Sequence, residues 1–427
     1  MHDLREIRNN PEQFLEGMSR REPDFNLDEL LEMDQKKREI TQKLDEMRQM
    51  RNSVSKQIGQ KRKAKEESSD LETEMRQLGK DMKAGEEEER ELDQNLRQLL
   101  LSWPNIPSDL TPIGKSEADN VVKRNWGEIP TFDFELNDHL DVANRLGMLD
   151  FTRGGKIAGS GFPLWRNAGA LLERALINFM LDVQTVEHGY TEMLTPLMAN
   201  RDSMLGSGQI PKLEDDMYLC EKEDLFLIPT AEVTLVNQYR GEILNEEDLP
   251  LKFAAYSPCF RREGGAYGST TRGFLRTHQF NKVELVRFER PEEADEVWEE
   301  MIGHAEEILR RLELPYRILQ LCSGDLTFNS KVCCDIEIWA PADGGKWVEA
   351  SSISNCGEFQ SRRAGIKYRP KGGGKARFPH ILNGSGLATS RLLVALLETY
   401  QTEEGSLAIP PVLRPYMHGQ TVVTATN

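Results

Sequence analysis

The chain has 427 residues, of which 38% are apolar and 29% charged. This length accommodates two or three domains at roughly 100–200 residues each, and the apolar share excludes a disordered chain. Acidic residues outnumber basic ones by 71 to 54, so a net charge of −17 argues against a protein that coats nucleic acid indiscriminately. We see no secretion signal, and no apolar run reaches the roughly 18 residues of a membrane span. The six cysteines lack zinc-site spacing, so we expect reduced thiols and a cytoplasmic protein.

Two heptad patterns near the N-terminus predict a helical hairpin. Apolar residues recur at alternating steps of three and four over 30–58 and again over 71–99. This spacing is typical of coiled coils. The break between the patterns contains Gly59, and the segment 69–72 fits a capping box that would start the second helix. We therefore expect an antiparallel hairpin with arms of about 40–45 Å, at 1.5 Å per residue. Four positions interrupt the patterns: Lys37, Arg51, Gly85 and Glu89.

Charge is distributed unevenly along this hairpin. The stretch 47–65 holds seven basic residues and no acidic one, whereas 86–89 is a run of glutamates. The basic residues are Arg48, Arg51, Lys56, Lys61, Arg62, Lys63 and Lys65. A solvated coiled coil with a skewed surface is one interpretation. The other is an arm whose distal half contacts phosphates, since such contacts need only lysine and arginine within reach.

Prolines mark the end of the hairpin. Pro104 and Pro107 stop the second helix, because proline cannot continue it. Prolines and polar residues continue to about residue 120. We therefore expect an N-terminal domain at 1–102, a linker at 103–120 and a larger domain at 121–427.

The larger domain mixes helical and strand periods. Helical patterns cover 170–188, 294–312 and 386–400. Strand-like runs lie at 191–198, 225–230, 251–262, 277–288, 316–321, 333–339 and 346–354. Because strands and helices follow each other without a repeating βαβ order, we expect an α+β domain with an antiparallel or mixed sheet.

Residues suited to catalysis recur at a spacing of two in three of these segments. The sets are Thr230 with Glu232, Arg261 with Glu263, and Phe280 with Lys282 and Glu284. Residues two apart share one face of a strand. The last two sets flank a glycine-rich loop with Arg272 and Arg276, so we expect a hairpin that presents an arginine, carboxylates and an aromatic ring. The plain alternative is the solvent-exposed face of a strand.

Two further motifs follow. Residues 349–352 place a carboxylate and a hydroxyl three positions apart, and 383–386 is expected to lead directly into a helix that carries Arg391. Oxygen donors suit Mg²⁺, and arginines and helix N-termini suit anions. No Ser/His/Asp or Cys/His arrangement stands out. The combination predicts phosphate-anhydride chemistry in which the substrate supplies the nucleophile.

These motifs resemble those of bacterial-type seryl-tRNA synthetases, a family of class II aminoacyl-tRNA synthetases, over nearly the whole chain. The most specific segments are 229–232, 259–263, 271–273, 278–284, 351–356 and 382–388. The resemblance implies an α+β protein: an N-terminal antiparallel coiled-coil hairpin that binds tRNA, then a class II antiparallel sheet domain flanked by helices. It also implies a homodimer built on 170–196, with motif 2 at 251–288 and motif 3 at 381–400.

The resemblance further implies a serine–tRNA ligase that uses ATP and Mg²⁺ to make seryl-adenylate and charges tRNA(Ser), and also tRNA(Sec) where one exists. The catalytic residues would be Arg261, Glu284 and Arg391. L-Serine would contact Thr230, Ala231, Glu232, Arg261, Glu284 and Ser385. ATP would contact Arg261, Arg262, Glu263, Arg276, Phe280, Glu349, Ala350, Ser351, Ser352 and Arg391. Glu349 and Ser352 would be metal ligands, and the basic residues of the arm would bind tRNA.

Some positions depart from the family pattern. Ser390 stands where glycine is usual, Gly161 where arginine is expected, and 333–334 is a cysteine pair where a bulkier pair is expected; 266–271 lacks a usual charged pair. Two alternatives remain. One is a paralogue that loads an amino acid onto a carrier protein, against which the complete arm argues. The other is an inactive RNA-binding paralogue, against which the intact arginines and glutamates argue.

Overall fold

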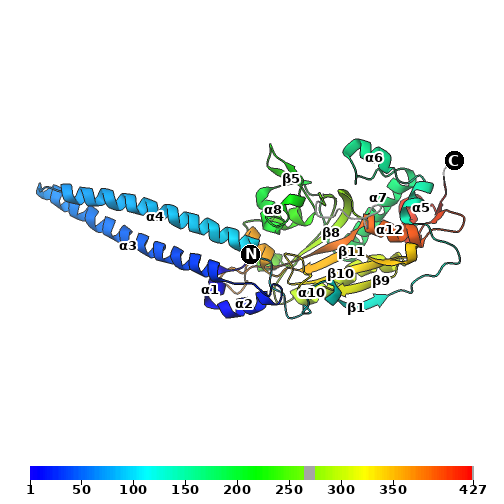
Figure 1. Ribbon diagram of the computed structural model, residues 1–427, viewed down its shortest axis with the longest axis horizontal. Helices are drawn as coiled ribbons and strands as arrows, with labels where there is room; N and C mark the ends of the chain where they lie inside the picture. Colours follow the sequence, from blue (N-terminus) through cyan, green and yellow to red (C-terminus); the bar gives the residue numbers. More distant parts are fainter. Residues whose placement is uncertain (264–274, 426–427) are drawn as a thin grey trace. The chain divides into compact units, whose positions relative to one another are not determined.

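The computed structural model describes residues 1–263 and 275–425 (Figure 1). Contacts divide them into two compact units, His2–Trp103 and, with Met1, the described residues from Pro104 onward. Within the described ranges, none of the helices combines the length and the apolar character that a membrane span needs.

The first unit contains α1 (Leu4–Asn9), α2 (Pro11–Ser19), α3 (Asp28–Ala64) and α4 (Ser69–Ser102). Figure 1 shows α3 and α4 side by side as a long hairpin. At 1.5 Å per residue, α3 is about 55 Å long, because it extends beyond the heptad pattern at both ends. Gly59 does not interrupt it. The capping box expected at 69–72 is wrong: α4 begins at Ser69, and Ser68 precedes it without a side-chain cap.

Polar residues in the heptad seam have partners across the hairpin. Lys37 forms an ion pair with Asp93, and Thr41 Oγ1 donates a hydrogen bond to Glu89 Oε1 at 2.5 Å. Gly85 lets the helices approach closely, because a Cβ atom there would lie 3.0 Å from Leu44 Cδ2. These interruptions are therefore compatible with a continuous hairpin, whose core comprises Ile40, Leu44, Leu78, Met82 and Leu92.

An eight-stranded sheet forms the centre of the second unit, in the order β1-β9-β10-β11-β13-β8-β7-β2. All neighbours are antiparallel except β2 and β7. The strands are β1 (Val121–Trp126), β2 (Thr191–Glu192), β7 (Leu251–Phe260), β8 (Gln279–Glu289), β9 (Tyr316–Gln320), β10 (Val332–Ala340), β11 (Lys346–Asn355) and β13 (His380–Ala388). Smaller sheets combine β3 (Met198–Asn200), β4 (Leu219–Cys220) and β5 (Leu225–Leu227); β6 (Ile243–Asn245) and β12 (Lys367–Arg369); and β14 (Leu407–Ala408) and β15 (Val422–Val423).

The second unit also contains helices. They are α5 (His139–Arg145), α6 (Phe151–Ala158), α7 (Asn167–Asp182), α8 (Arg201–Ser207), α9 (Glu232–Asn237), α10 (Ala294–Arg311), α11 (Phe359–Ala364) and α12 (Thr389–Thr399). The long helices α7, α10 and α12 share one apolar core with the sheet, in which Trp298, Phe179 and Leu393 are buried. Burial of such side chains is the main stabilising term in a layer of this kind.

Two helix boundaries differ from the sequence-based expectation. The helix expected at 170–188 is α-helical only to Asp182 and continues as a π-helical turn, Val183–Glu187. The helix expected at 386–400 begins at Thr389, because β13 continues to Ala388, which pairs with Lys282 on β8. Residues 383–386 are therefore part of a strand and not the start of a helix.

The segment expected as a linker is attached to the second unit. Asn105 Nδ2 donates hydrogen bonds to the carbonyls of Asn329 and Cys356, both at 2.8 Å. Thr111 Oγ1 donates to the Lys331 carbonyl at 2.7 Å. These bonds hold 104–111 against the loops beside β10 and β11.

Candidate functional site

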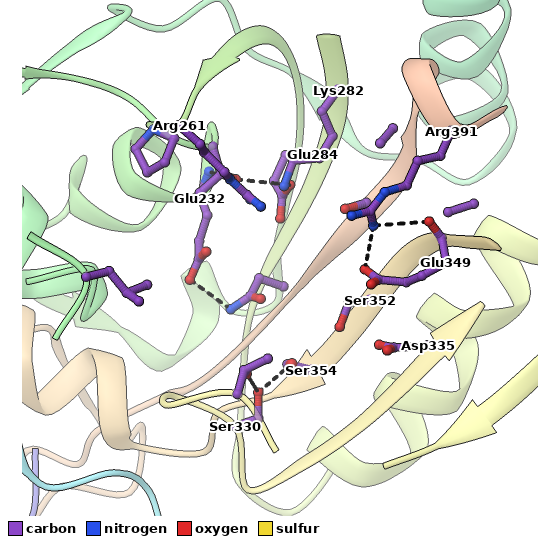
Figure 2. A pocket seen from close by; sticks show the side chains of 18 of the residues that line it. Glu232, Arg261, Lys282, Glu284, Ser330, Asp335, Glu349, Ser352, Ser354 and Arg391 are labelled. Atoms are coloured by element: carbon purple, nitrogen blue, oxygen red, sulfur yellow. Dashed lines mark hydrogen bonds and ion pairs between the residues drawn. The ribbon is translucent and has the colours of Figure 1, made fainter. Parts of the chain in front are cut away.

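One cavity of about 630 Å³ collects most of the residues singled out in the sequence (Figure 2). Among those that line it are Thr230, Glu232, Arg261, Glu263, Arg276, Phe280, Lys282, Glu284, Glu349, Ala350, Ser352, Ser385 and Arg391. Ala231, Arg262 and Ser351 do not line it. Ala231 packs into an apolar cluster, and Ser351 Oγ donates to the Ser385 carbonyl at 2.6 Å. Arg272 and the 266–271 segment lie outside the described residues.

Glu232 is buried at the start of α9 among three side-chain amides. Gln360 Nε2 donates to Glu232 Oε1 at 2.5 Å, and Asn383 Nδ2 lies 3.3 Å from the same oxygen. Gln209 Nε2 lies 3.5 Å from Oε2. Burial, and then the nearby Glu284 carboxylate, raises the pKa of Glu232 to about 7. The Gln360 amide opposes this shift, because its hydrogen bond stabilises the ionised form.

A second carboxylate, Glu284, lies on β8 beside a buried lysine. Lys282 Nζ is 2.5 Å from Glu284 Oε2, and Thr230 Oγ1 donates to the same oxygen at 3.2 Å. Lys282 and Glu284 are two apart on β8 and share a face, as expected. Thr230 and Glu232 do not share a strand face: β5 ends at Leu227, and the Glu232 N–H donates to Thr230 Oγ1 at 3.2 Å in the first turn of α9.

Arg261 lies just past the end of β7. Its guanidinium is 5.2 Å from the ring centroid of Phe280. Its backbone N–H donates to the His278 carbonyl at 3.0 Å and so extends the pairing of β7 with β8 by one hydrogen bond. Arg261 and Glu263 do not share a strand face, because β7 ends at Phe260 and Glu263 has a φ of 50°. Arg276 Nη1 nevertheless lies 3.7 Å from Glu263 Oε2.

A β-bulge aligns Glu349 and Ser352. Ile336 on β10 faces Ser351, but Glu337 faces Glu349, so Ala350 is an extra residue on β11. In a regular strand, residues three apart point to opposite faces, and an extra residue moves one of them to the other face. Glu349 and Ser352 consequently both line the cavity.

Arg391 and Asp335 complete this side of the cavity, as Figure 2 shows. Arg391 Nη1 lies 3.0 Å from Glu349 Oε1 and donates to the Glu349 carbonyl at 3.1 Å. Asp335 pairs with Ser352 across the strands. Burial, and then Glu349, raises the pKa of Asp335 well above its usual value.

The donor set at Ser352 fits Mg²⁺. Carboxylate and hydroxyl oxygens are hard ligands, and Mg²⁺ is commonly held by one or two carboxylates with waters and substrate phosphates. In the part of the chain that the structure describes, no group of three His, Cys, Asp or Glu side chains could hold a metal without such help. Glu349 and Ser352 are therefore suited to a metal that arrives with a phosphate ligand.

Three of the departures from the family pattern can be located in the structure. Gly161 has a φ of +83°, and a Cβ there would lie 2.6 Å from His278 Cδ2, so any larger residue would have to displace His278. Cys333 and Cys334 are buried, and Cys333 Sγ lies 3.2 Å from Ser352 Oγ. Ser390 lines the cavity next to Arg391.

Sequence reasoning missed four polar residues of the site. Gln209, Gln360 and Asn383 surround Glu232, and Asp335 lies beside Ser352. The three amides come from distant segments, so no local spacing connects them. Asp335 and Glu337 do show the spacing of two that marks one strand face. That signal was available in the sequence.

Comparisons with known proteins cover both units. Residues 1–107 match the family model of the seryl-tRNA synthetase N-terminal domain, and 217–400 match that of the class II tRNA synthetase core domain (G, H, P, S and T). The serine–tRNA ligase of Citrifermentans bemidjiense is 49% identical, covering 98% of this chain and 99% of the relative. That of Prosthecochloris aestuarii is 50% identical, covering 97% of each.

Solved structures of seryl-tRNA synthetases are also similar to this chain over its full length. A seryl-tRNA synthetase from Pyrococcus horikoshii, complexed with ATP, superposes with a TM-score of 0.92 at 36% identity and covers 100% of both chains. The cytoplasmic serine–tRNA ligase of Naegleria fowleri, in complex with AMP, gives 0.87 at 28% identity, covering 100% of this chain and 99% of that one. The α+β fold predicted from the sequence is confirmed, and the chain belongs to the seryl-tRNA synthetase family of class II aminoacyl-tRNA synthetases.

Proposed function

We propose that this chain activates L-serine with Mg-ATP, forming seryl-adenylate and pyrophosphate, and then transfers serine to tRNA(Ser). The observation that carries the proposal is the meeting of two carboxylates, Glu232 and Glu284, with two arginines, Arg261 and Arg391, in one cavity. The curated relatives at 49–50% identity are named serine–tRNA ligases. The similar Pyrococcus horikoshii structure holds ATP.

The serine half of the cavity is built from acids and hydroxyls. Thr230, Glu232, Glu284 and Ser385 surround the amino acid, and the acids accept hydrogen bonds from its ammonium and hydroxyl groups. A site that hydrogen-bonds the substrate hydroxyl rejects alanine and glycine, because its own buried polar groups would be left without partners. Threonine is excluded by size.

The ATP half supplies stacking and positive charge. Phe280 stacks on the adenine, and Glu263 lies beside that ring. Arg261 and Arg391 bind phosphate oxygens, Arg276 adds charge around the β- and γ-phosphates, and Ala350 adjoins them. These residues suit the reaction because they position and stabilise charge without supplying a nucleophile.

Adenylate formation then needs no protein nucleophile. A serine carboxylate oxygen attacks the α-phosphorus, the bond to the β-phosphate oxygen breaks, and pyrophosphate leaves with the developing charge. Glu284 orients serine, and fixed arginine charges stabilise the transition state more than the ground state. Glu349 and Ser352 would hold Mg²⁺, which neutralises phosphate charge when bound.

The two units have different proposed roles. We assign tRNA binding to residues 1–102 and catalysis to 121–427, joined by 103–120. The side chains of Arg51, Lys56, Lys63 and Lys65 are exposed and have no ion-pair partner in the described ranges. This availability supports phosphate contacts by the arm. The basic residues assigned to this contact are Arg48, Arg51, Lys56, Lys61, Arg62, Lys63 and Lys65. The same arm would serve tRNA(Sec).

We further assign a homodimer in the cytoplasm, where tRNA charging feeds translation. The segment 170–196 supports association, because two of its large apolar side chains are exposed, Val186 at 80% and Leu194 at 92%. A second subunit seated on this segment would remove such side chains from water.

The test is ATP–pyrophosphate exchange with serine, threonine, alanine and glycine, followed by charging of total tRNA. Exchange with serine alone, together with charging, is the expected result. Exchange without charging would favour a carrier-protein ligase, and no exchange with any amino acid would favour an inactive RNA-binding paralogue. Either outcome would overturn the proposal.

A further inference from the structure

A second stretch without acids lies in the catalytic unit. Residues 359–380 contain seven lysines and arginines and no acidic residue, in a chain whose net charge is −17. The seven are Arg362, Arg363, Lys367, Arg369, Lys371, Lys375 and Arg377. The stretch 47–65 of the arm has the same count. The proposed pocket chemistry uses none of these seven residues.

The middle of this stretch is a closed loop, residues 369–376, which we call the basic loop. The Tyr368 N–H donates to the Arg377 carbonyl at 2.8 Å, and the Arg377 N–H donates to the Tyr368 carbonyl at 2.9 Å. Within the loop, the Lys371 N–H donates to Glu246 Oε2 at 2.6 Å. The Gly373 N–H also donates to the Pro370 carbonyl at 3.0 Å. These bonds fix both ends of the loop and two inner positions.

Three cations of the basic loop are available to a ligand. Arg362 and Arg377, outside the loop, each form an ion pair with a glutamate, at 2.7 and 2.6 Å. Arg369, Lys371 and Lys375 are exposed, and their side chains make no hydrogen bond or ion pair with any residue that the structure describes. Glu246, which lies against the loop, accepts from the Lys371 backbone N–H, and no ion pair joins it to these three side chains in the described ranges. The loop therefore carries an excess of uncompensated positive charge.

The tip of the basic loop is open. A Cβ atom built on Gly372, Gly373 or Gly374 would meet nothing within 4 Å. Gly373 and Gly374 have φ values of +79° and +107°, which suit glycine. Without side chains at the tip, an anion can reach both the backbone and the flanking Lys371 and Lys375.

We propose that the basic loop binds the phosphate backbone of the tRNA substrate, as a contact separate from the arm. This inference rests on the proposed function. A chain with a large negative charge repels a polyanion, so tRNA binding depends on local basic surfaces, and phosphate contacts need only lysine or arginine within reach. None of the loop residues lines the cavity. The contact therefore contributes tRNA affinity and leaves amino-acid activation unchanged.

The test compares wild type with the double variant Lys371→Ala/Lys375→Ala. The control, Lys222→Ala/Lys346→Ala, removes two exposed lysines elsewhere on the same unit. Serine-dependent pyrophosphate exchange, the KM for tRNA(Ser) and the tRNA Kd are measured from 50 to 300 mM salt. Each lost phosphate contact lowers the slope of log affinity against log salt by about 0.7–0.9.

We expect unchanged exchange, a KM and Kd for tRNA raised by roughly tenfold, and a salt slope reduced by about 1.5, with no change in the control. The charge-preserving variant Lys371→Arg/Lys375→Arg should retain the wild-type slope. A loop variant with wild-type tRNA affinity and slope would overturn the inference, as would an equal loss in the control. An absence of exchange in the wild type would instead refute the proposed function.

Discussion

Replacing Gln360, whose side-chain amide binds Glu232, is the most specific test of the proposed serine site. Gln360 is fully buried, and its Nε2 donates both to Glu232 Oε1 at 2.5 Å and to the Ser207 carbonyl at 2.9 Å. Its Oε1 accepts from Asn383 Nδ2 at 3.2 Å. Gln360→Met keeps the approximate volume and removes all three hydrogen bonds.

The magnitude follows from the charge on the partner. A hydrogen bond to an ionised group contributes about 1.5–3 kcal/mol, so we expect the serine KM of the Gln360→Met variant to rise by roughly 10–150-fold. The ATP KM should change little, because Gln360 contacts no residue assigned to ATP. Steady-state pyrophosphate exchange measures both constants.

The pH dependence gives a second readout. In the proposed complex, ionised Glu232 binds the serine ammonium, so the serine KM should fall as the pH rises through the Glu232 pKa of about 7. The Gln360 hydrogen bond lowers that pKa, so its loss moves the inflection to higher pH. The Glu232 carboxyl of the variant therefore keeps its proton to higher pH, and raising the pH should partly restore serine binding.

The matched control is Gln401→Met. Gln401 is also a buried glutamine, and it binds the Asn137 carbonyl away from the cavity. Its replacement should lower the melting temperature without changing the serine KM. Equal increases in the serine and ATP KM of Gln360→Met, or an inflection that does not move, would refute the argument that Gln360 acts through Glu232.

Three other changes test different parts of the enzyme. Arg261→Ala should lower serine-dependent exchange by about 10²–10³-fold with an unchanged melting temperature, since a fixed transition-state charge is lost; wild-type exchange would remove Arg261 from catalysis. Removing residues 31–98 should preserve exchange and cripple tRNA charging, and unchanged charging efficiency would remove the arm from tRNA binding. Deleting Ala350 should straighten β11 and turn Glu349 away from Ser352, which should weaken Mn²⁺ binding in the presence of ATP, as followed by electron paramagnetic resonance. The control Ala350→Gly should keep the metal affinity. Equal affinities in the two variants would contradict the role of the bulge.

Local periodicity was sufficient for part of this structure. The hairpin follows from heptads that recur within each helix, so no distant contact is needed to predict α3 and α4. Lys282 and Glu284 share a face because a spacing of two is a property of any regular strand. Such patterns are readable in the sequence because neighbouring residues alone determine them.

The rest of the site geometry depends on contacts between segments that are distant in the sequence. Glu349 and Ser352 face the same cavity only because β11 carries an extra residue opposite β10. The spacing of residues in the sequence does not predict that bulge. Glu232 reaches the site from the first turn of α9, although its spacing from Thr230 favoured a strand. In both cases the residues were identified, but the geometry that brings them together depends on elements far away in the sequence.

The two carboxylates of the serine pocket have different electrostatic partners. Glu284 is paired with a buried cation, Lys282, at 2.5 Å, so its charge is compensated within the protein. Glu232 has hydrogen-bond donors from neutral amides, so burial keeps its pKa high. In the proposed complex, a substrate ammonium adds positive charge directly beside Glu232 and favours its ionised form. Serine binding and Glu232 ionisation therefore stabilise each other, and the amides determine at which pH this coupling begins.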